Sequence, residues 1–443
     1  MIDLSEEIIM LHIKFVRENV DLVLASEKRR GRDSSNVDAA LEMDEAWRSS
    51  KTGLQEMQKM RNTVSEEINK LMKAGKKADA VPKIKEMKEL VEKLKSKEAE
   101  VNGFLDERNA SLKKIGNVLE ESVPKGKDES ENVTLREVGT KPKFDFEVKD
   151  HIEIMEELGL VDLDTAAAIS GARFYFLKNE AVLLDYALQR FALDLLRNRG
   201  FNLIYTPFML NRAALEGGVN LSEFEDTIYK IENEDLYLIG TSEHPLVALK
   251  KDSVMNEKEF PLKLAGTSTC FRKEAGSHGR DTKGIFRVHQ FTKIEQIIYC
   301  KPEESKAFFD ESQAISEEIF SQLGIPFRVQ QICTGDIGNK QALQYDIEAW
   351  YPGQNGKKGA YREVTSCSNC TDYQSVTLNT KYVDTSKKGE KRYPHIINNT
   401  AIATSRAMVA IFENYQQADG SVKIPKVLIP YMSGIEVIAA NKK

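Results

Sequence analysis

The chain contains 443 residues, of which 41% are hydrophobic and 30% are charged, and its formal net charge at pH 7 is -6. A single hydrophobic core rarely extends over this length, so we expect two domains. Because the net charge is negative, no global positive field attracts nucleic acid, and any nucleic-acid contact must come from a local basic patch.

The amino-terminal segment MIDLSEEIIMLHIKFVREN argues against export and membrane insertion. It starts with acidic residues, whereas a secretory signal peptide starts with basic ones. Its apolar run is too short for a membrane span, and no later segment is long and apolar enough to cross a bilayer. We therefore expect a cytoplasmic protein without a membrane contact.

Five cysteines occur along the chain, at positions 270, 300, 333, 367 and 370. Their odd number and irregular spacing argue against the disulfide framework of a secreted protein. Cys367 and Cys370 form a CxxC pair, but no second pair completes a four-ligand zinc site. We interpret them as buried structural thiols.

Residues 38 to about 119 are predicted to form two long helices. Apolar residues recur there at spacings that alternate between three and four, which places a narrow apolar seam on each helix. The seam residues are Trp47, Leu54, Met57, Val64, Ile68 and Leu71, then Ile84, Met87, Val91, Leu94, Val101, Leu105, Leu112, Ile115 and Leu119. Between the runs, Gly75 and Pro82 interrupt the pattern. We predict an antiparallel coiled-coil hairpin within an amino-terminal domain of residues 1–122.

The tip of this hairpin is basic. Ten lysines and four acidic residues lie between Lys70 and Lys97, which gives a local charge of +6 in a chain that is negative overall. A solvated coiled-coil surface is one interpretation, and it is the usual one for an isolated helical hairpin. The lopsided charge favours phosphate binding instead.

Residues 123–150 contain turn-forming residues and no periodicity, which predicts a linker. In residues 151–443, strand-like runs alternate with helices, and we predict an α+β domain whose antiparallel sheet is flanked by helices. Neither a GxGxxG nor a Walker A segment occurs, so a Rossmann or P-loop nucleotide site is not supported. An amphipathic helix ends at Gly200, and the next strand, FNLIYTPFML, is broken by Pro207, as an edge strand would be.

The segment TSTCFRKEAGSHGRDTKGIFRVHQFTKIEQ predicts a strand, a basic loop and a second strand. Residues two apart on a strand point the same way, so Arg272 and Glu274 share a face. The loop adds Lys273, His278, Arg280, Lys283 and Arg287, and the second strand presents His289, Phe291, Lys293 and Glu295 at alternate positions. Such a face suits a nucleoside triphosphate and a small ammonium-bearing molecule. On alternation alone, a hairpin with a solvated charged loop is the better interpretation.

The residues themselves resemble one family. FRKEAGSHGRDTKGIFRVHQFTKIEQ is similar to motif 2 of class II aminoacyl-tRNA synthetases, in the form carried by seryl-tRNA synthetases. TSEHPL, REVTSCSN and NNTAIATSRAMVAIFENYQ resemble that family's serine loop, metal-binding strand and motif 3, in the family's order. The strand broken by Pro207 resembles motif 1, which forms the dimer interface. The resemblance covers nearly the whole chain.

This resemblance implies a class II catalytic domain over residues 151–443, in a cytosolic homodimer. The family activates L-serine with ATP and transfers it to tRNA(Ser), and commonly also to tRNA(Sec). In the family, the helical arm grips the long variable arm of the tRNA through its shape and backbone, which suits lysine-rich contacts.

The resemblance also implies an ATP site. Arg272 would bind the α-phosphate, Arg406 the γ-phosphate, and Phe291 would stack beneath adenine. Glu363 and Ser366 would hold Mg²⁺ bound to ATP, since Mg²⁺ needs few protein oxygens beside water and phosphate. The other implied ATP contacts are Lys273, Glu274, Arg287, Val288, Val364 and Thr365. Arg272, Glu363 and Arg406 would be catalytic, because the site must align two anions and neutralise charge developing at phosphorus.

Serine recognition needs a carboxylate for the ammonium group and polar groups for the hydroxyl. The residues implied for this task are Thr241, Glu243, Arg272, Glu295 and Thr400. In the family, the position of Thr400 reads the hydroxyl. A site that hydrogen-bonds a substrate hydroxyl rejects alanine by about 10⁴-fold or more.

Three features depart from the family pattern. Asn399 and Ser405 stand where relatives often have glycine, and a positive φ would strain serine there. The segment DYQSVTLNTKY lacks an arginine pair that is usual in relatives. Residues 1–9 form an extension, which leaves Met1 and Met10 as alternative starts.

Two other functions stay open. One is a synthetase paralogue that charges a carrier protein, against which the basic hairpin argues. The other is a regulator that keeps the fold without the chemistry, against which the intact Arg272, Glu295 and Arg406 argue.

Overall fold

The computed structural model describes residues 11–219, 225–275 and 283–439. The chain divides into two compact units, one ending at Val118 and the other beginning at Leu119. Among the described residues, no helix is both long enough and apolar enough to cross a membrane. All five cysteines are buried, and none of them forms a disulfide bond.

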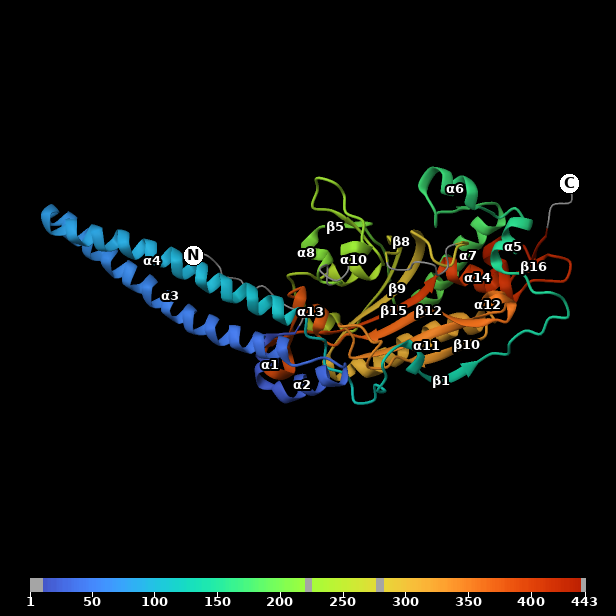
Figure 1. The fold of residues 1–443 in the computed structure, drawn as a ribbon, viewed down its shortest axis with the longest axis horizontal. Helices are drawn as coiled ribbons and strands as arrows, with labels where there is room; N and C mark the ends of the chain where they lie inside the picture. Colours follow the sequence, from blue (N-terminus) through green and yellow to red (C-terminus); the bar gives the residue numbers. More distant parts are fainter. Residues whose placement is uncertain (1–10, 220–224, 276–282, 440–443) are drawn as a thin grey trace. The chain divides into compact units, whose positions relative to one another are not determined.

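The first unit consists of helices. Two short helices, α1 (Ile13–Glu18) and α2 (Val20–Arg29), precede the long helices α3 (Ser35–Lys73) and α4 (Lys77–Leu112), which form the predicted hairpin (Figure 1, blue to cyan). The seam between α3 and α4 buries Trp47, Leu54, Leu90, Leu94 and Val101. Two cross-helix contacts fix the antiparallel register: Ser50 Oγ donates to Glu100 Oε1 (2.6 Å), and Lys83 Nζ lies 3.0 Å from Glu67 Oε2.

The turn of the hairpin is shorter than the sequence predicts. Gly75 adopts a φ of +75°, which suits glycine, and α4 starts at Lys77 rather than after Pro82. Pro82 therefore lies inside α4, where it removes one backbone N–H. The continuous packing of α4 against α3 outweighs this local cost. At its other end, α4 stops at Leu112, before the seam predicted to reach residue 119.

The second unit is built on an eight-stranded sheet with the order β1-β10-β11-β12-β15-β9-β8-β4. Every neighbouring pair is antiparallel except β4 and β8, which are parallel. In that order, the strands are Val133–Val138, Phe327–Gln331, Leu343–Tyr351, Ala360–Asn369, His395–Ala403, Gln290–Cys300, Leu262–Phe271 and Asn202–Tyr205. The predicted antiparallel sheet is confirmed.

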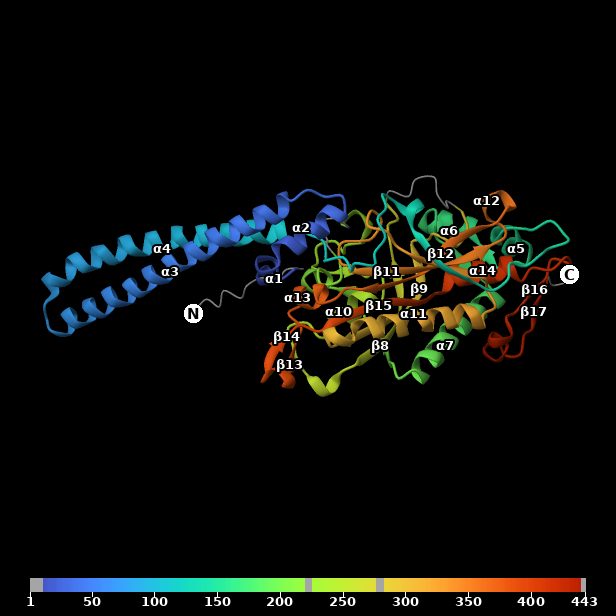
Figure 2. The ribbon, with the colours of Figure 1, turned by 90° about the horizontal axis from the view of Figure 1, so that it is seen from below.

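Helices cover one face of this sheet. The helix α11 (Ser305–Gln322) lies across the strands (Figure 2), and the side chains of Gln296 and Asn399 donate hydrogen bonds to it. The helix α7 (Glu180–Asn198) packs beside it on β8, β9 and β15. We call the opposite face, toward which Glu295 and Thr400 point, the site face.

Two β-bulges interrupt the regular alternation by which successive side chains of a strand point to opposite faces of the sheet. Glu363 pairs with Glu348, but Thr365 pairs with Ile347, so Val364 is an extra residue in β12. A bulge of this kind lets residues three apart point to the same face, which brings Glu363 and Ser366 onto the site face together. A second bulge at residue 401 of β15 does the same for residues 400 and 403.

The segment predicted as a linker belongs to the second unit. It supplies the edge strand β1, which pairs with β10. Lys141 Nζ lies 4.1 Å from the ring centre of Trp350, and the backbone N–H of Lys149 donates to Gln416 Oε1 (2.9 Å). Residues 123–150 are thus fastened to the sheet. An edge strand with one polar, exposed face has too little apolar periodicity to be recognised from sequence.

Candidate active site

The two predicted strands around Arg272 are confirmed as β8 (Leu262–Phe271) and β9 (Gln290–Cys300), but Arg272 and Glu274 follow β8 rather than lying in it. β8 and β9 pair antiparallel, and Arg272 follows the last residue of β8. Its Nε donates to the carbonyl of Gly240 (3.0 Å), and its guanidinium lies 5.3 Å from the ring centre of Phe291. The predicted loop residues His278 and Arg280 lie outside the described residues.

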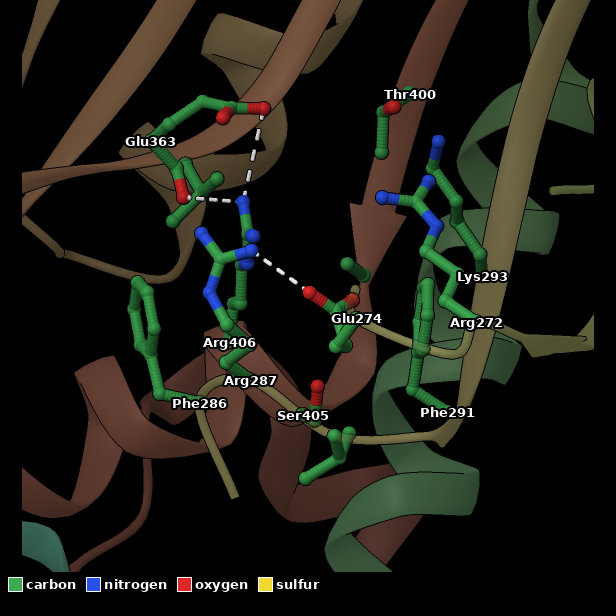
Figure 3. Close-up of a pocket in the computed structure, with 13 residues that line it drawn as sticks. Arg272, Glu274, Phe286, Arg287, Phe291, Lys293, Glu363, Thr400, Ser405 and Arg406 are labelled. Carbon is green, nitrogen blue, oxygen red and sulfur yellow. Dashed lines mark hydrogen bonds and ion pairs between the residues drawn. The ribbon is translucent and has the colours of Figure 1, made fainter. Parts of the chain in front are cut away.

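A pocket opens beside Arg272 on the site face (Figure 3). Its walls come from the arms of motif 2, from β9, β12 and β15, and from the start of α14 (Thr404–Asn414). The lining residues are Arg272, Glu274, Phe286, Arg287, Val288, Phe291, Lys293, Glu363, Val364, Thr400, Ala403, Ser405 and Arg406. All of these except Phe286, Lys293, Ala403 and Ser405 are predicted from the sequence as site residues.

The predicted residues that do not line this pocket are Thr241, Glu243, Lys273, Glu295, Thr365 and Ser366. The backbone N–H of Lys273 donates to the carbonyl of Thr227 (2.9 Å), and its Nζ lies 5.9 Å from the ring centre of Tyr229. Thr365 is buried and points to the sheet face opposite Glu363. The other four lie next to the pocket, as described below.

The pocket has a cationic lining that includes two ion pairs. Arg287 Nη1 lies 2.7 Å from Glu274 Oε2. Arg406 Nη1 donates to the carbonyl of Glu363 (2.8 Å) and lies 3.6 Å from its Oε1 (Figure 3). Because the lining contains four cationic and two acidic side chains, the pocket suits a polyanion.

An aromatic ring supports the arginines on the side of motif 3. The ring centre of Phe286 lies 5.0 Å from the guanidinium of Arg406 and 4.4 Å from that of Arg362. Tyr351 donates from its hydroxyl to the carbonyl of Arg406 (3.0 Å). Sequence reasoning missed Phe286, because a phenylalanine near a loop is more often a core residue.

A buried polar cluster adjoins the pocket. Glu295 Oε1 accepts hydrogen bonds from Thr400 Oγ1 (3.0 Å) and Thr241 Oγ1 (3.3 Å), and Lys293 forms an ion pair with the same carboxylate. Lys293 and Thr400 also line the pocket, so the cluster and the pocket share a wall. Lys293 alternates with Phe291 and Glu295 along β9, and this spacing was the signal available in the sequence.

Glu243 lies behind this cluster, and its carboxylate already has protein partners. Glu243 Oε1 accepts from Lys340 Nζ (2.5 Å), Gln374 Nε2 (2.7 Å) and Asn398 Nδ2 (3.2 Å). Burial raises the pKa of Glu243, but the neighbouring charges, that of Lys340 foremost, and the hydrogen bonds from Lys340 and Gln374 together outweigh it and hold the pKa below the ordinary value. The carboxylate is therefore ionised and fixed in place. No motif in the sequence singles out Lys340.

Several side-chain oxygen atoms of β11 and β12 lie close together on the site face. Asp346 is the cross-strand partner of Ser366, and Gln344 Nε2 donates to Asp346 Oδ1 and to Ser366 Oγ (both 3.0 Å). Burial and the charge of Glu363 raise the pKa of Asp346. A divalent cation would offset this repulsion, so two carboxylates and a hydroxyl fit Mg²⁺. The described residues contain no group of three or more His, Cys, Asp or Glu side chains that could hold a metal ion. Mg²⁺ that is bound mainly through phosphate and water does not need such a group. Sequence reasoning missed Asp346.

Comparisons with known proteins agree with this geometry. Residues 10–119 match the profile of the seryl-tRNA synthetase N-terminal domain, and residues 225–415 match that of the class II tRNA synthetase core domain for G, H, P, S and T. The serine–tRNA ligase of Methanoregula boonei is 49% identical over 97% of this chain and 100% of its own length. The chain belongs to the seryl-tRNA synthetase family.

Solved structures of seryl-tRNA synthetases share the fold. The enzyme from Pyrococcus horikoshii, crystallised with ATP, is 42% identical and superposes with a TM-score of 0.87 over 98% of this chain and all of that one. The cytoplasmic serine–tRNA ligase from Naegleria fowleri, crystallised with AMP, is 38% identical, with a TM-score of 0.83 over 98% of this chain and 99% of that one.

The two positions expected from the sequence to depart from the family's motif 3 fit regular structure. Neither Asn399 nor Ser405 has a positive φ, so neither position needs glycine. Asn399 lies in β15, and its Nδ2 donates to the carbonyl of Ser312 (2.8 Å) and to Ser316 Oγ (2.9 Å) on α11. Ser405 lies in the first turn of α14 and lines the pocket. The predicted extension of residues 1–9 lies outside the described residues.

Proposed function

We propose that this protein is a serine–tRNA ligase, which activates L-serine with ATP and transfers the seryl group to tRNA(Ser) in the cytoplasm. One observation carries the proposal. A cationic pocket and a buried Glu295–Thr400–Thr241 cluster share Lys293 and Thr400 as a common wall. A polyanion in the pocket and a small amino acid on the cluster would therefore meet at that wall.

The proposed reaction joins the serine bound on one side of this wall to the ATP bound on the other. A serine carboxylate oxygen forms a bond to the α-phosphorus while the bond from that phosphorus to the bridging oxygen breaks, and the electron pair leaves with pyrophosphate. Arg272 would neutralise charge at the α-phosphate, and Arg406 would hold the γ-phosphate. Phe291 lies within stacking reach of Arg272 and would support adenine.

Glu295 is the proposed partner of the serine ammonium group. It lies at the bottom of the shared wall, 2% exposed, and Thr400 beside it would read the hydroxyl. When an ammonium group binds Glu295, Lys293 is released to face the serine carboxylate. Glu243, fixed by Lys340 and two amides, would hold this wall in place.

Glu363 and Ser366 are the proposed Mg²⁺ ligands, with Asp346 beside them. When bound, the ion would neutralise charge on the ATP phosphates. The chain's own part is to keep these oxygens on one face, which the bulge at Val364 achieves. Gln344 orients Ser366 and Asp346 through its amide.

The substitution Asp346→Asn tests whether the Asp346 carboxylate takes part in binding Mg²⁺ or has only a structural role. The folded-state pKa of Asp346 is raised, so its ionised form destabilises the folded protein at pH 7. We expect the variant to melt at a higher temperature than the wild type without Mg²⁺ at pH 7. That difference should vanish when the pH falls below the ordinary aspartate pKa, because Asp346 of the wild type is then protonated in both the folded and the unfolded state. The Mg²⁺ concentration for half-maximal serine activation should rise at least about tenfold. An unchanged Mg²⁺ requirement would contradict the assignment.

The known relatives support the same function. The related chains from Methanoregula boonei and Methanocella arvoryzae, which are 49% and 48% identical to this one, are serine–tRNA ligases. The related Pyrococcus horikoshii enzyme binds ATP in its crystal structure. The direct test of activation is serine-dependent exchange of pyrophosphate into ATP, with threonine and alanine as controls. Exchange with serine alone is expected, and exchange that ignores the amino acid would contradict the proposal.

The basic hairpin is the proposed contact for tRNA(Ser), and for tRNA(Sec) by the same backbone-reading mode. The lysines between Lys70 and Lys97 are exposed or half-buried along α3 and α4 and at the turn between them. Lysines of this kind contact phosphates without reading bases. The arm would therefore select its tRNA by shape rather than by sequence.

We further propose a homodimer formed through the edge at β4 and the outer face of α7. This edge exposes Leu183, Tyr186, Leu203, Tyr205 and Met209, with Tyr205 76% exposed. An unpaired strand edge with large apolar side chains is typical of a partner contact.

Glutamates at Leu203 and Tyr205 should turn the dimer into a monomer, because like charges would meet across an apolar contact. Light scattering should give twice the chain mass for the wild type and a single chain mass for this double variant. Ile169→Glu is the matched control, because Ile169 is 68% exposed on α6 (Leu163–Ser170), outside this edge. A dimeric double variant would place the interface elsewhere.

A further inference from the structure

A buried histidine–glutamate pair lies beside the pocket without lining it. His151 is the first residue of α5 (His151–Glu157) and is 3% exposed, and Glu413 is fully buried near the end of α14. His151 Nδ1 lies 3.2 Å from Glu413 Oε1, and the backbone N–H of His151 donates to the same oxygen (3.3 Å). The pair thus joins α5 to the helix that carries Arg406.

The other nitrogen of His151 reaches motif 2. His151 Nε2 accepts a hydrogen bond from the backbone N–H of Ile285 (3.4 Å). Because Nε2 accepts, Nδ1 must carry the proton that it donates to Glu413. The ring also lies against Gly284, whose φ is +81°, and a Cβ at that position would be 2.2 Å from Nε2. Only glycine allows this approach.

The residues that follow this contact belong to the pocket. Ile285 is succeeded by Phe286 and Arg287, which both line it. Phe286 lies under the guanidinium of Arg406, and Arg287 pairs with Glu274. A shift of the chain at Ile285 would therefore move two lining side chains at once.

Glu413 extends the same network to a third element. Its Oε2 accepts from the backbone N–H of Gly353 (2.8 Å), and its Oε1 accepts from Gln354 Nε2 (3.2 Å), in the connection between β11 and β12. Gln354 in turn lies 3.5 Å from Arg362 Nη1, and Arg362 lies over Phe286. One buried carboxylate thus ties together α14, α5 and the β11–β12 connection, and His151 adds the returning arm of motif 2.

We propose that His151 is a positioning residue for ATP. It acts by holding Ile285, and through Ile285 it places Phe286 and Arg287 in register with Arg406. It does not contact the nucleotide itself. This inference rests on the proposed function, because it assigns the pocket between these side chains to ATP. It predicts an effect on ATP and none on serine, whose proposed site lies around Glu295, on the far side of Lys293.

Two substitutions divide the roles of the two ring nitrogens. In His151→Asn, the amide nitrogen stands near the place of Nδ1, so the bond to Glu413 is kept and the bond to Ile285 is lost. In His151→Gln, the longer side chain brings an oxygen near the place of Nε2, so the acceptor for Ile285 is kept. The KM for ATP in serine-dependent pyrophosphate exchange should rise about tenfold in His151→Asn and stay close to the wild-type value in His151→Gln. The KM for serine should change in neither.

Melting temperatures and direct ATP binding by calorimetry complete the experiment. An unchanged KM for ATP in His151→Asn, or equal rises for ATP and serine, would overturn the inference while leaving the proposed function intact. Equal rises for ATP in both variants would overturn it as well. If His151→Asn does not fold, Gly284→Ala disturbs the same contact from the opposite side and should raise the KM for ATP selectively. A wild-type protein that binds no ATP would overturn the proposed function and this inference together.

Discussion

Replacing Arg272 by alanine is expected to lower serine-dependent pyrophosphate exchange by at least about 10³-fold. Arg272 is a cation of the proposed ATP pocket and lies near Lys293 and Thr400 (Figure 3), and its guanidinium is fixed by Gly240 and by the ring of Phe291. The two reacting groups are both anions, so without this charge they repel one another at the moment of attack.

Folding should survive this substitution. Arg272 is half-buried, and its Nε makes one hydrogen bond, to a backbone carbonyl at the edge of the pocket, so the melting temperature should fall by only a few degrees. Arg136→Ala is a suitable control, because Arg136 lies on β1 and pairs with Glu317 on α11, away from the pocket lining. Exchange near the wild-type rate in Arg272→Ala would contradict the site.

Shortening the hairpin is expected to lower charging of tRNA by at least about 100-fold and to leave pyrophosphate exchange unchanged. The cross-helix contacts of Ser50 with Glu100 and of Lys83 with Glu67 set the register for a matched deletion. Removing residues 56–73 and 77–94 takes five full turns from each helix and keeps the turn between them. The arm then loses about 27 Å of reach.

A second variant separates charge from length. Lys70, Lys73, Lys76, Lys77, Lys83 and Lys85 can be changed to glutamine in the full-length hairpin. If phosphate contacts carry the binding, this variant should also charge poorly, and the salt dependence of charging should weaken. Both variants retain Trp47 and the buried Asp44–Arg108 pair at the base of the hairpin. Normal charging by the shortened protein would mean that the arm does not bind tRNA.

Much of the fold could be predicted because its signals are local. The seam of α3 and α4 repeats every three or four residues over ten turns, and no alternative element accounts for such a run. The start of α4 was predicted too late in the chain, because helix propensity disfavours Pro82 as a single residue. The packing of the whole helix against α3 outweighs that local preference. β1 was missed for the opposite reason, since an edge strand is stabilised by its neighbour and not by its own pattern.

Site residues that belong to a sequence motif could be predicted, whereas those that reach the site through the pairing of distant strands could not. Lys293 alternates visibly with Glu295, but Asp346 enters the site only through its register with Ser366 across two strands. The bulge at Val364 is equally invisible in the sequence, and without it Glu363 and Ser366 would point to opposite faces. Lys340 reaches Glu243 from 97 residues away, and no local rule reports such a contact.

We expect one chain both to activate serine and to load it onto tRNA. Attachment of labelled serine to total tRNA, with ATP and Mg²⁺ and with threonine and alanine beside it, tests this most directly. We predict charging with serine alone. Serine-dependent pyrophosphate exchange without any charging would contradict this expectation and point to an acceptor other than tRNA. The absence of both activities would favour a regulator that has kept the fold.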